Sequence, residues 1–543
     1  MTPVMDADGR DGADGTPARF SSVDWARRQA MRARSLATNL MHLRPHDVPL
    51  SLTAWARRHV LNDERLNSAR FLLFFWFGAR FLALGIWALI PSAQGDVYYY
   101  YDRMALLADL GPAQLAAEYP TPALFFLYIP YILGLGSARG YIIAFVLVMV
   151  ALDAAFTYSL WLKSGHMRGL AVIFWTSFLG LIGPVAYLRF DLVTSVLCGW
   201  ALMFLMRHHA WMAGVMIGLG ASFKLWPALL WGALCGSDKK HNLKVTFGIG
   251  LTGATLAGIS LLWGGWDRLL SPLSYQTDRG LQVESVWATV PMLLRAAGQG
   301  DFVVAISRYQ AFEVWGTSTS FWASAADVAA LVGYAVIAAA SLAFALRGRG
   351  RMMESCALVL LFITVLIVAN KTFSPQYVIW LGAPAAAMFT VLGGGDEPPS
   401  TGTLHRYTQP ASGLQTVARG TNTYAADWRH VKRIAIIILV VCGLTTVIFP
   451  IGYGALVNEA GDWVLLSVRG LLTCVLALRN TLVVALLVEL VRWVWSFTNP
   501  DVWVPHQDDG SPETLSIPTS PTSLSVPHTA SSTTPNTTET VDA

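Results

Sequence analysis

Long apolar runs recur along this chain and constrain its fold more than any other feature. One run, YIIAFVLVMVALDAAFTYSLWL, begins at Tyr141, and another, RIAIIILVVCGLTTVIFPIGY, begins at Arg433. A helix needs roughly 20 such residues to cross a hydrocarbon core of about 30 Å. Only 13% of the 543 residues are charged, whereas soluble domains carry about 25%. Because a β-barrel would show short alternating segments instead, the sequence predicts an all-α polytopic membrane protein.

About twelve apolar segments are predicted to cross the membrane as helices. They begin near Phe71, Pro122, Tyr141, Gly169, Asp191, Trp211, Val245, Ala323, Ser355, Pro375, Arg433 and Val464. The segment after Pro122 is short, and the last segment contains Arg469 and Arg479.

Basic residues predict the orientation of these helices. The first seventy residues hold eleven arginines and no lysine, and short loops rich in Lys and Arg remain in the cytoplasm. Strict alternation then places both termini in the cytoplasm and leaves Lys163 and Arg168 outside. It also creates two longer extracytoplasmic loops, from about Ser92 to Thr121 and from about Asp267 to Trp322.

Composition divides the chain into five segments. Residues 1–69 form a basic cytoplasmic arm, either an amphipathic helix on anionic lipid or an unstructured extension. Transmembrane segments occupy 70–394 and 432–497, with a polar cytoplasmic linker at 395–431. The Ser/Thr/Pro-rich acidic tail, 498–543, has too few apolar residues to fold. Membrane lipids are the expected surroundings, and no nucleic-acid partner is expected, because the basic residues lie at membrane edges rather than in one patch.

The first long loop carries the candidate acids. Asp96 directly follows the first span, where a carboxylate can act as general base on an acceptor hydroxyl; a helix cap or a solvated loop acid is the alternative. Asp102 follows six residues later, and Glu118 closes the loop as a second candidate acid. Tyr99 belongs to a run of tyrosines that suits an interfacial belt or stacking on a sugar. No ligand spacing supports a divalent metal near Asp96 and Asp102, and the five cysteines form no CxxC or Cys/His cluster.

Ionisable residues inside apolar spans are costly, so they pair or line cavities. Asp153, Arg189, Asp191, Lys224 and Lys371 stand in such positions. Arg and Lys there suit a phosphate, and snorkelling or an internal salt bridge is the alternative.

The second long loop contains SYQTDRGLQVESVWA. Arg279 is a candidate phosphate clamp, and Gln282 and Glu284 are candidate hydrogen-bonding partners of hydroxyls. A surface salt bridge between Arg279 and Glu284 is the alternative reading.

Together these motifs resemble a known family. The order is GD after the first span, EYPTP before the second, then RFDLV, AGVMIGLGASFKLWPALL, SYQTDRGLQVESVWA and NKTFSPQYVIWL. This set resembles the actinobacterial polyprenol-phosphate-mannose-dependent mannosyltransferases of the GT-C superfamily, over roughly Phe71 to Val391. The resemblance implies a GT-C-like bundle in a bacterial plasma membrane and an inverting hexosyltransferase. The donor would be a polyprenyl-phosphate sugar, with no further cofactor firmly predicted, and the acceptor an extracytoplasmic glycolipid or glycan.

The resemblance also implies roles for residues. Asp96 matches the family's catalytic acid, and Arg279 and Lys371 match its phosphate-binding cations by placement. Candidate acceptor or donor contacts are Asp102, Tyr99, Glu118, Gln282, Glu284 and Gln376. Arg189, Asp191 and Lys224 fall toward the cytoplasmic half under strict alternation, so a structural role is expected for them. The sequence departs from many relatives at Thr121, which interrupts a double proline.

Three other functions fit parts of the pattern. A multi-pass lipid or glycan transporter or flippase would show two similar halves with matching interrupted helices, and no such pairing is visible. A polysaccharide ligase or polymerase would need a large late outer loop, whereas the segment from Tyr453 to Trp463 is short. A structural scaffold would leave the charges inside the spans unexplained.

Overall fold

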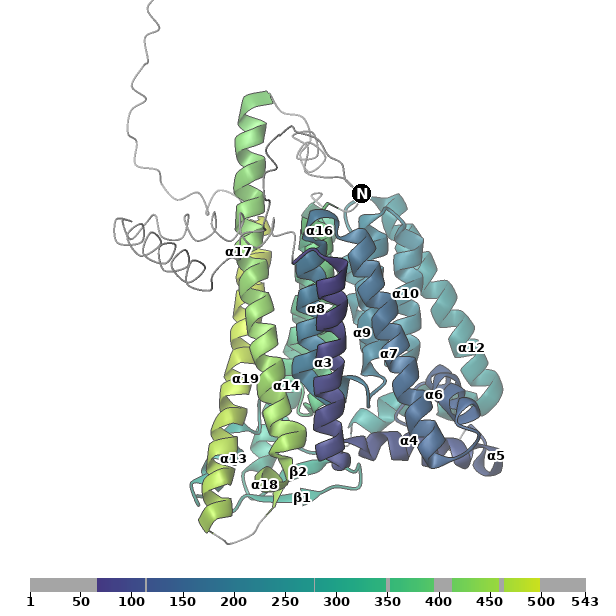
Figure 1. Cartoon of the computed structure of the whole chain (residues 1–543), viewed down its shortest axis with the longest axis vertical. Coiled ribbons are helices and arrows are strands. Elements are labelled where there is room, and N and C mark those ends of the chain that lie inside the picture. The colour runs from purple at the N-terminus through teal and green to yellow at the C-terminus, as the bar shows by residue number, and fades with distance from the viewer. Residues whose placement is uncertain are drawn as a thin grey trace, which may run out of the picture. The chain divides into compact units, whose positions relative to one another are not determined.

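The computed structural model describes residues 66–112, 115–277, 279–347, 352–394, 413–458 and 463–498. These residues form a helical bundle with one small antiparallel hairpin (Figure 1), which confirms the predicted all-α class. The basic arm up to residue 65 and the tail from residue 499 lie outside the described residues. The same holds for residues 395–412 of the linker.

In the described parts of the chain, nine helices are long and apolar enough to cross a membrane, and three further apolar helices are shorter. A helix stands at each of the twelve predicted positions. The longer elements are α3 (Ala69–Leu89), α7 (Ala138–Lys163), α8 (Arg168–Ile182), α12 (Lys239–Thr277), α14 (Thr319–Arg347), α15 (Met352–Ala369), η6 (Pro375–Leu381) with α16 (Gly382–Leu392), α17 (Gly413–Thr446) and α19 (Trp463–Thr498). The shorter three are α6 (Thr121–Leu133), α9 (Asp191–Met206) and α10 (Ala210–Phe223).

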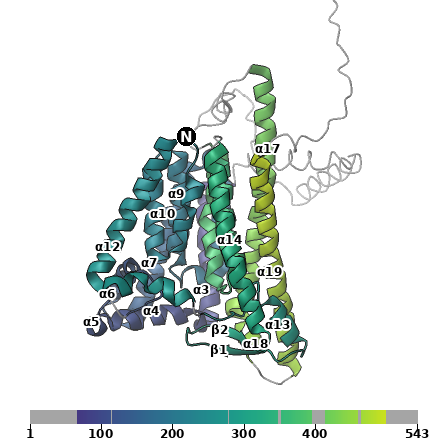
Figure 2. The ribbon, with the colours of Figure 1, turned by 180° about the vertical axis from the view of Figure 1, so that it is seen from behind.

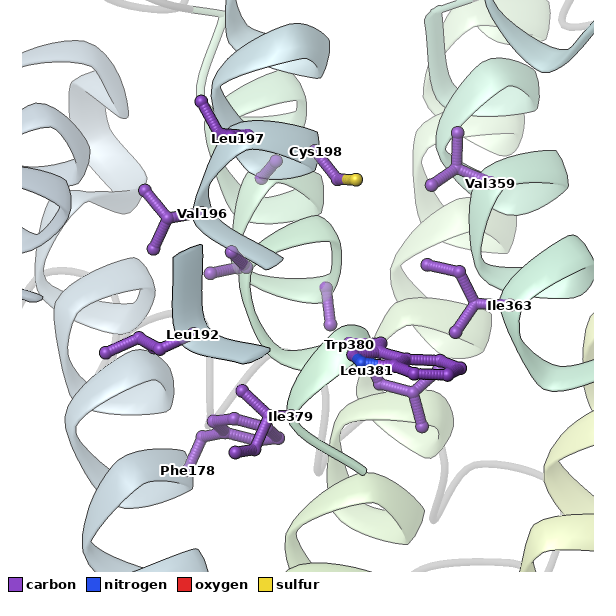
Figure 3. Close-up of a cluster of buried hydrophobic side chains, with 14 of the residues drawn as sticks. Phe178, Leu192, Val196, Leu197, Cys198, Val359, Ile363, Ile379, Trp380 and Leu381 are labelled. Carbon is purple, nitrogen blue, oxygen red and sulfur yellow. The ribbon is translucent and has the colours of Figure 1, made fainter. Parts of the chain in front are cut away.

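The core lies between α8, α9, α15 and the η6–α16 segment. Figure 3 shows a cluster of apolar side chains from these elements that includes Phe178, Val196, Ile363 and Trp380, and all four side chains are buried. The outer helices are different, because α3 exposes large aromatic side chains such as Phe74. Exposed apolar surface of this kind is stable against acyl chains and unstable in water, so the surface agrees with a membrane protein.

Two ends of the bundle differ. One end, here named the loop end, carries α4 (Gly95–Ala105), α5 (Leu107–Leu110), α13 (Thr289–Ala296), α18 (Tyr453–Val457) and the hairpin of β1 (Val303–Ile306) and β2 (Phe312–Trp315) (Figures 1 and 2). At the opposite end, the backbone amide of Gly169 donates to the side chain of Asn67 at 3.2 Å. The hydroxyls of Ser164 and Thr390 meet there at 2.8 Å. The start of α3, the α7–α8 connection and the end of α16 therefore share that opposite end.

Helix α6 corrects the predicted alternation. At its start, Tyr119 packs on Tyr100 of α4, with ring centres 6.2 Å apart. At its end, the hydroxyl of Tyr101 in α4 donates to the carbonyl of Gly136 at 3.0 Å. Both ends of α6 thus contact the same short helix, so its 13 residues stay at the loop end and do not cross the bundle.

The order of crossings therefore shifts by one from α7 to α10. The segment of η5 (Trp226–Leu230) and α11 (Trp231–Leu234) then returns the chain to the start of α12, where Nε2 of His241 lies 2.9 Å from the carbonyl oxygen of Leu234, so α12 and the later helices keep their predicted ends. Lys163 and Arg168, predicted to lie outside with the loops, lie at the end opposite the loop end. Arg189, predicted to lie toward the cytoplasmic half, instead lies at the loop end. Its guanidinium donates to the carbonyl of Ala93 at 3.3 Å, beside the first long loop. The predicted placement of these residues was wrong because hydropathy does not separate a helix that crosses from one that turns back.

Two boundaries also differ from the sequence prediction. Helix α12 continues to Thr277 after a break at Gly265, where φ is 71°; this left-handed conformation favours glycine. The second loop is correspondingly shorter than predicted. Helix α17 begins at Gly413, so the second half of the linker predicted at 395–431 is helical.

Candidate active site at the loop end

Asp96 stands in the first turn of α4, where the helix dipole favours a carboxylate. Its Oδ2 lies 2.5 Å from Nε of Arg189, and the two side chains are 40% and 7% exposed respectively. Arg189 is itself held, because its Nη1 donates to the carbonyl of Leu188 at 3.0 Å. A buried cation therefore orients the Asp96 carboxylate while much of that carboxylate stays accessible.

A second ion pair lies beside the first. The ammonium of Lys224 is 2.7 Å from Oδ1 of Asp191, and the indole N–H of Trp380 donates to the same oxygen at 2.7 Å. The ammonium also lies between 5.2 and 5.9 Å from four aromatic ring centres, those of Tyr119, Phe190, Tyr377 and Trp380. Rings at this distance attract a cation. The other oxygen of Asp191, Oδ2, is buried without a protein hydrogen-bond partner among the described residues.

Two buried tyrosines join these pairs. Burial raises the pKa of Tyr100 well above its ordinary value, and the nearby charge of Asp96 adds to this. Burial likewise raises the pKa of Tyr119, with Glu118, Asp96 and Asp191 among the contributing charges. Both hydroxyls are therefore neutral near pH 7.

Glu118 completes the group. The hydroxyl of Tyr99 donates to Oε1 of Glu118 at 2.6 Å, and Glu118 contributes to the electrostatic surroundings of Tyr119. We use the name charged cluster for Asp96, Glu118, Arg189, Asp191 and Lys224. Two of these, Arg189 and Lys224, were expected in the cytoplasmic half; the structure instead places both at the loop end, with the acids.

Asp102 is not brought into the charged cluster. Six residues along an α-helix correspond to about 240° around its axis, and Asp102 is exposed on α4. Gln376 is half-buried and adjoins Tyr377, whose ring faces Lys224.

Gln282 and Glu284, predicted as substrate contacts, are engaged within the protein. The side-chain amide of Gln282 donates to Ser374 at 3.0 Å. Glu284 is fully buried, and its Oε2 lies 3.2 Å from Nη1 of Arg479. Burial raises the pKa of Glu284 to about 7, against the opposing effect of Arg479. The predicted alternative of a salt bridge between Arg279 and Glu284 is therefore wrong.

The two predicted phosphate-binding cations lie on segments that touch. The backbone amide of Gln282 donates to the carbonyl of Lys371 at 3.1 Å, which joins the second loop to the start of the η6 segment. Lys371 is 3.1 Å from the exposed carboxylate of Asp327. The guanidinium of Arg279 lies 5.8 Å from the ring centre of Tyr309, and its Nε is buried without a protein partner among the described residues.

Residues 118–369 match the model of Glycosyltransferase family 87. The match supports a membrane glycosyltransferase of the GT-C-like type. It includes four members of the charged cluster, whereas Asp96 precedes the matched segment. No curated protein and no solved structure matches the chain.

Within the segment matched to family 87, the sequence reading missed Arg268. This residue follows the break at Gly265 and is 1% exposed. Nη1 donates to Ser271 at 2.9 Å, but Nε and Nη2 have no protein partner among the described residues. Glu118 acts on it electrostatically. No pattern in the sequence marks this residue, because its burial follows the bend in α12.

The sequence reading also missed Arg80, which lies before the matched segment. Arg80 and Asp153 form a buried ion pair between α3 and α7, with Nη2 and Oδ1 2.6 Å apart. An arginine in the middle of an apolar run was the available signal. Across the described ranges, no three His, Cys, Asp or Glu side chains form a group that could hold a metal ion.

Proposed function

We propose that the protein transfers a hexose from a polyprenyl-phosphate donor to a hydroxyl of an extracytoplasmic glycolipid or glycan. The proposed hexose is mannose. The match to Glycosyltransferase family 87 supports the reaction class. The resemblance of the motifs supports the lipid-linked donor and the sugar. The observation that carries the proposal is the Asp96 carboxylate, which is accessible at the loop end and oriented by the buried Arg189.

In the proposed reaction, the acceptor hydroxyl oxygen attacks the anomeric carbon of the donor sugar. Asp96 takes the hydroxyl proton as the new C–O bond forms, which is general base catalysis. The bond between the anomeric carbon and the phosphate oxygen breaks, and the electron pair leaves with the polyprenyl phosphate. Attack from the face opposite the leaving group inverts the anomeric configuration.

The leaving phosphate needs cations, since negative charge grows on it as the bond breaks. Arg279 and Lys371 are the proposed cations. Arg268 is added because its guanidinium has two buried nitrogens without a partner in the part of the chain that the structure describes, and buried polar groups normally have one. Arginine suits a phosphate because its planar fork can donate two parallel hydrogen bonds.

We propose that the loop end faces the extracytoplasmic side and that both termini are cytoplasmic. The corrected topology supports this orientation, because it moves Lys163 and Arg168 to the end that also carries Lys239 and Arg347. Basic residues in short loops are typical of the cytoplasmic side. Nucleotide sugars are absent outside the cytoplasm, so a donor there must arrive on a lipid.

The proposal is tested by assaying purified protein in lipid nanodiscs. Synthetic polyprenyl-phosphate mannose, the matching glucose donor and a nucleotide-linked mannose would each be offered with mannoside, arabinan and phosphoinositide acceptors. We expect transfer from the polyprenyl-phosphate mannose only. Transfer from the nucleotide donor alone would refute the lipid-linked donor, and movement of lipid across the bilayer without transfer would favour the flippase alternative.

A further inference from the structure

A groove of about 490 Å³ lies between α17 and α19, far along the chain from the charged cluster. Its lining is mostly apolar and includes Ile436 and Val488, but Arg433, Glu489 and Arg492 also line it. This combination of apolar surface and basic groups suits a ligand with a hydrocarbon part and an anionic part.

The apolar part of the groove is open to the surroundings of the bundle. Ile436 of α17 and Val488 of α19 are both exposed, as are Val440 and Val484 one turn further along these helices. In a membrane protein, exposed apolar side chains on long spanning helices contact acyl chains. The groove is therefore accessible from the lipid phase.

The two arginines lie near the same end of the two apolar spans. Arg433 directly precedes the run that begins at Ile434, and Arg492 lies six residues before Thr498, where the apolar span of α19 ends. Exposed Trp495 lies one turn beyond Arg492, and tryptophan is enriched at the membrane surface. Trp428 of α17 packs on Phe389 near the end of α16, with ring centres 6.5 Å apart, so this stretch of α17 lies near the end opposite the loop end. We therefore place both guanidinium groups at headgroup level at that end.

The single acid in the groove does not cancel this charge. Glu489 is buried, and its Oε1 lies 3.0 Å from Nδ1 of His430 and 3.4 Å from Nη1 of Arg433. The Arg433 side chain is nevertheless 56% exposed. Arg492 is exposed and forms no ion pair with any residue that the structure describes. The accessible charge at the mouth of the groove is thus positive.

We propose that this groove binds an anionic phospholipid, whose headgroup phosphate lies between Arg433 and Arg492 and whose acyl chain follows Ile436 and Val488. Basic pockets between spanning helices on the cytoplasmic side favour such headgroups. The site is separate from the charged cluster, so it does not depend on the proposed sugar transfer.

The test compares lipid binding by the full-length protein and two charge-matched double variants. Native mass spectrometry in detergent would measure the retention of phosphatidylglycerol and phosphatidylcholine. Arg433→Gln with Arg492→Gln removes both groove cations, and Lys239→Gln with Arg347→Gln removes two exposed cations from other helices at the same end. We expect the wild type and the control to retain phosphatidylglycerol in preference to phosphatidylcholine. The groove variant should bind phosphatidylglycerol about 25-fold more weakly, at about fivefold for each basic residue.

A further double variant, Arg433→Lys with Arg492→Lys, keeps the charge and should keep most of the preference. Its melting temperature, together with that of the Gln variant, would show whether either substitution disturbs folding. Equal retention of both lipids by the wild type would overturn the proposal. So would an equal loss of phosphatidylglycerol in the groove and control variants. Neither result would bear on sugar transfer, which is assayed separately.

Discussion

The buried ion pair of Arg80 and Asp153 allows a quantitative prediction about stability. Asp153 is fully buried, and it accepts hydrogen bonds from Arg80 at 2.6 and 2.8 Å, from Trp175 at 2.9 Å and from Tyr187 at 3.0 Å. The pair joins α3 to α7, and Trp175 adds α8. The substitution Asp153→Leu would leave the Arg80 guanidinium buried without its counter-charge.

The expected loss of free energy of unfolding in Asp153→Leu follows from two independent sets of measurements. Removing one partner of a buried ion pair costs about 3–5 kcal/mol, and a lone arginine at the centre of a spanning helix costs about 2.5–3.5 kcal/mol. Asp153→Leu should therefore lower the free energy of unfolding by about 3–4 kcal/mol. Adding Arg80→Met removes the stranded charge. The double variant should then lack only the acceptor for Trp175, Tyr187 and the half-buried Thr157, which donates to Oδ1 at 3.1 Å, at up to about 1 kcal/mol for each hydrogen bond.

Reversible unfolding in mixed detergent micelles, followed by tryptophan fluorescence, would measure these differences. The double variant should be more stable than Asp153→Leu alone by about 1 kcal/mol, the difference between a stranded buried charge and the lost hydrogen bonds. The reasoning would be refuted if Asp153→Leu cost less than about 1 kcal/mol, or if adding Arg80→Met made the protein less stable still.

Three further predictions concern the buried acid Glu284, the candidate phosphate-binding arginines, and Lys224. Because the pKa of Glu284 is raised from 4.5 to about 7 by burial, the folded state binds more protons than the unfolded state between these values. This contribution to stability is complete below about pH 4.5 and is lost as the pH rises through 7. Unfolding measured from pH 5 to 8 should show the loss, and Glu284→Gln should remove it. Arg268→Gln and Arg279→Gln should each raise the KM for a polyprenyl-phosphate donor at least tenfold, since a hydrogen bond to a charged group contributes about 1.5–3 kcal/mol; unchanged donor kinetics would exclude them as phosphate ligands. Lys224→Gln strands buried Asp191 and should lower the melting temperature, whereas Lys224→Arg should retain most of the wild-type value.

The positions of the helices could be predicted from the sequence because each apolar run is long. The path of the chain could not. Helix α6 has an apolar composition typical of a crossing segment, and only its contacts with Tyr100 and Tyr101 of α4 reveal that it turns back. Since the crossings from α7 to α10 depend on that one, a single error displaced Arg189 and Lys224 from the site.

The position of the candidate base could be predicted from the sequence, but the residues around it could not. Asp96 was found because it follows the first span directly, a position readable from hydropathy. Its orientation by Arg189 depends on a contact between residues 93 positions apart in the sequence, and the burial of Arg268 depends on the bend at Gly265. Glu284 was misread because its partner, Arg479, lies on the last described helix, far along the chain.

The central claim is that Asp96 acts as the base in sugar transfer. The most direct measurement compares the turnover of wild-type protein, Asp96→Asn and Asp109→Asn with polyprenyl-phosphate mannose in nanodiscs. Asp109 is an exposed acid on α5 of the same loop, so its variant is a matched control. General base catalysis contributes about 10²–10⁴ in rate, so Asp96→Asn should lose at least a hundredfold in kcat. Its melting temperature should fall modestly, because the buried Arg189 loses its counter-charge, but the protein should remain folded at the assay temperature. Asp109→Asn should match the wild type in both measurements. A folded Asp96→Asn protein with activity within about threefold of the wild type would contradict the account.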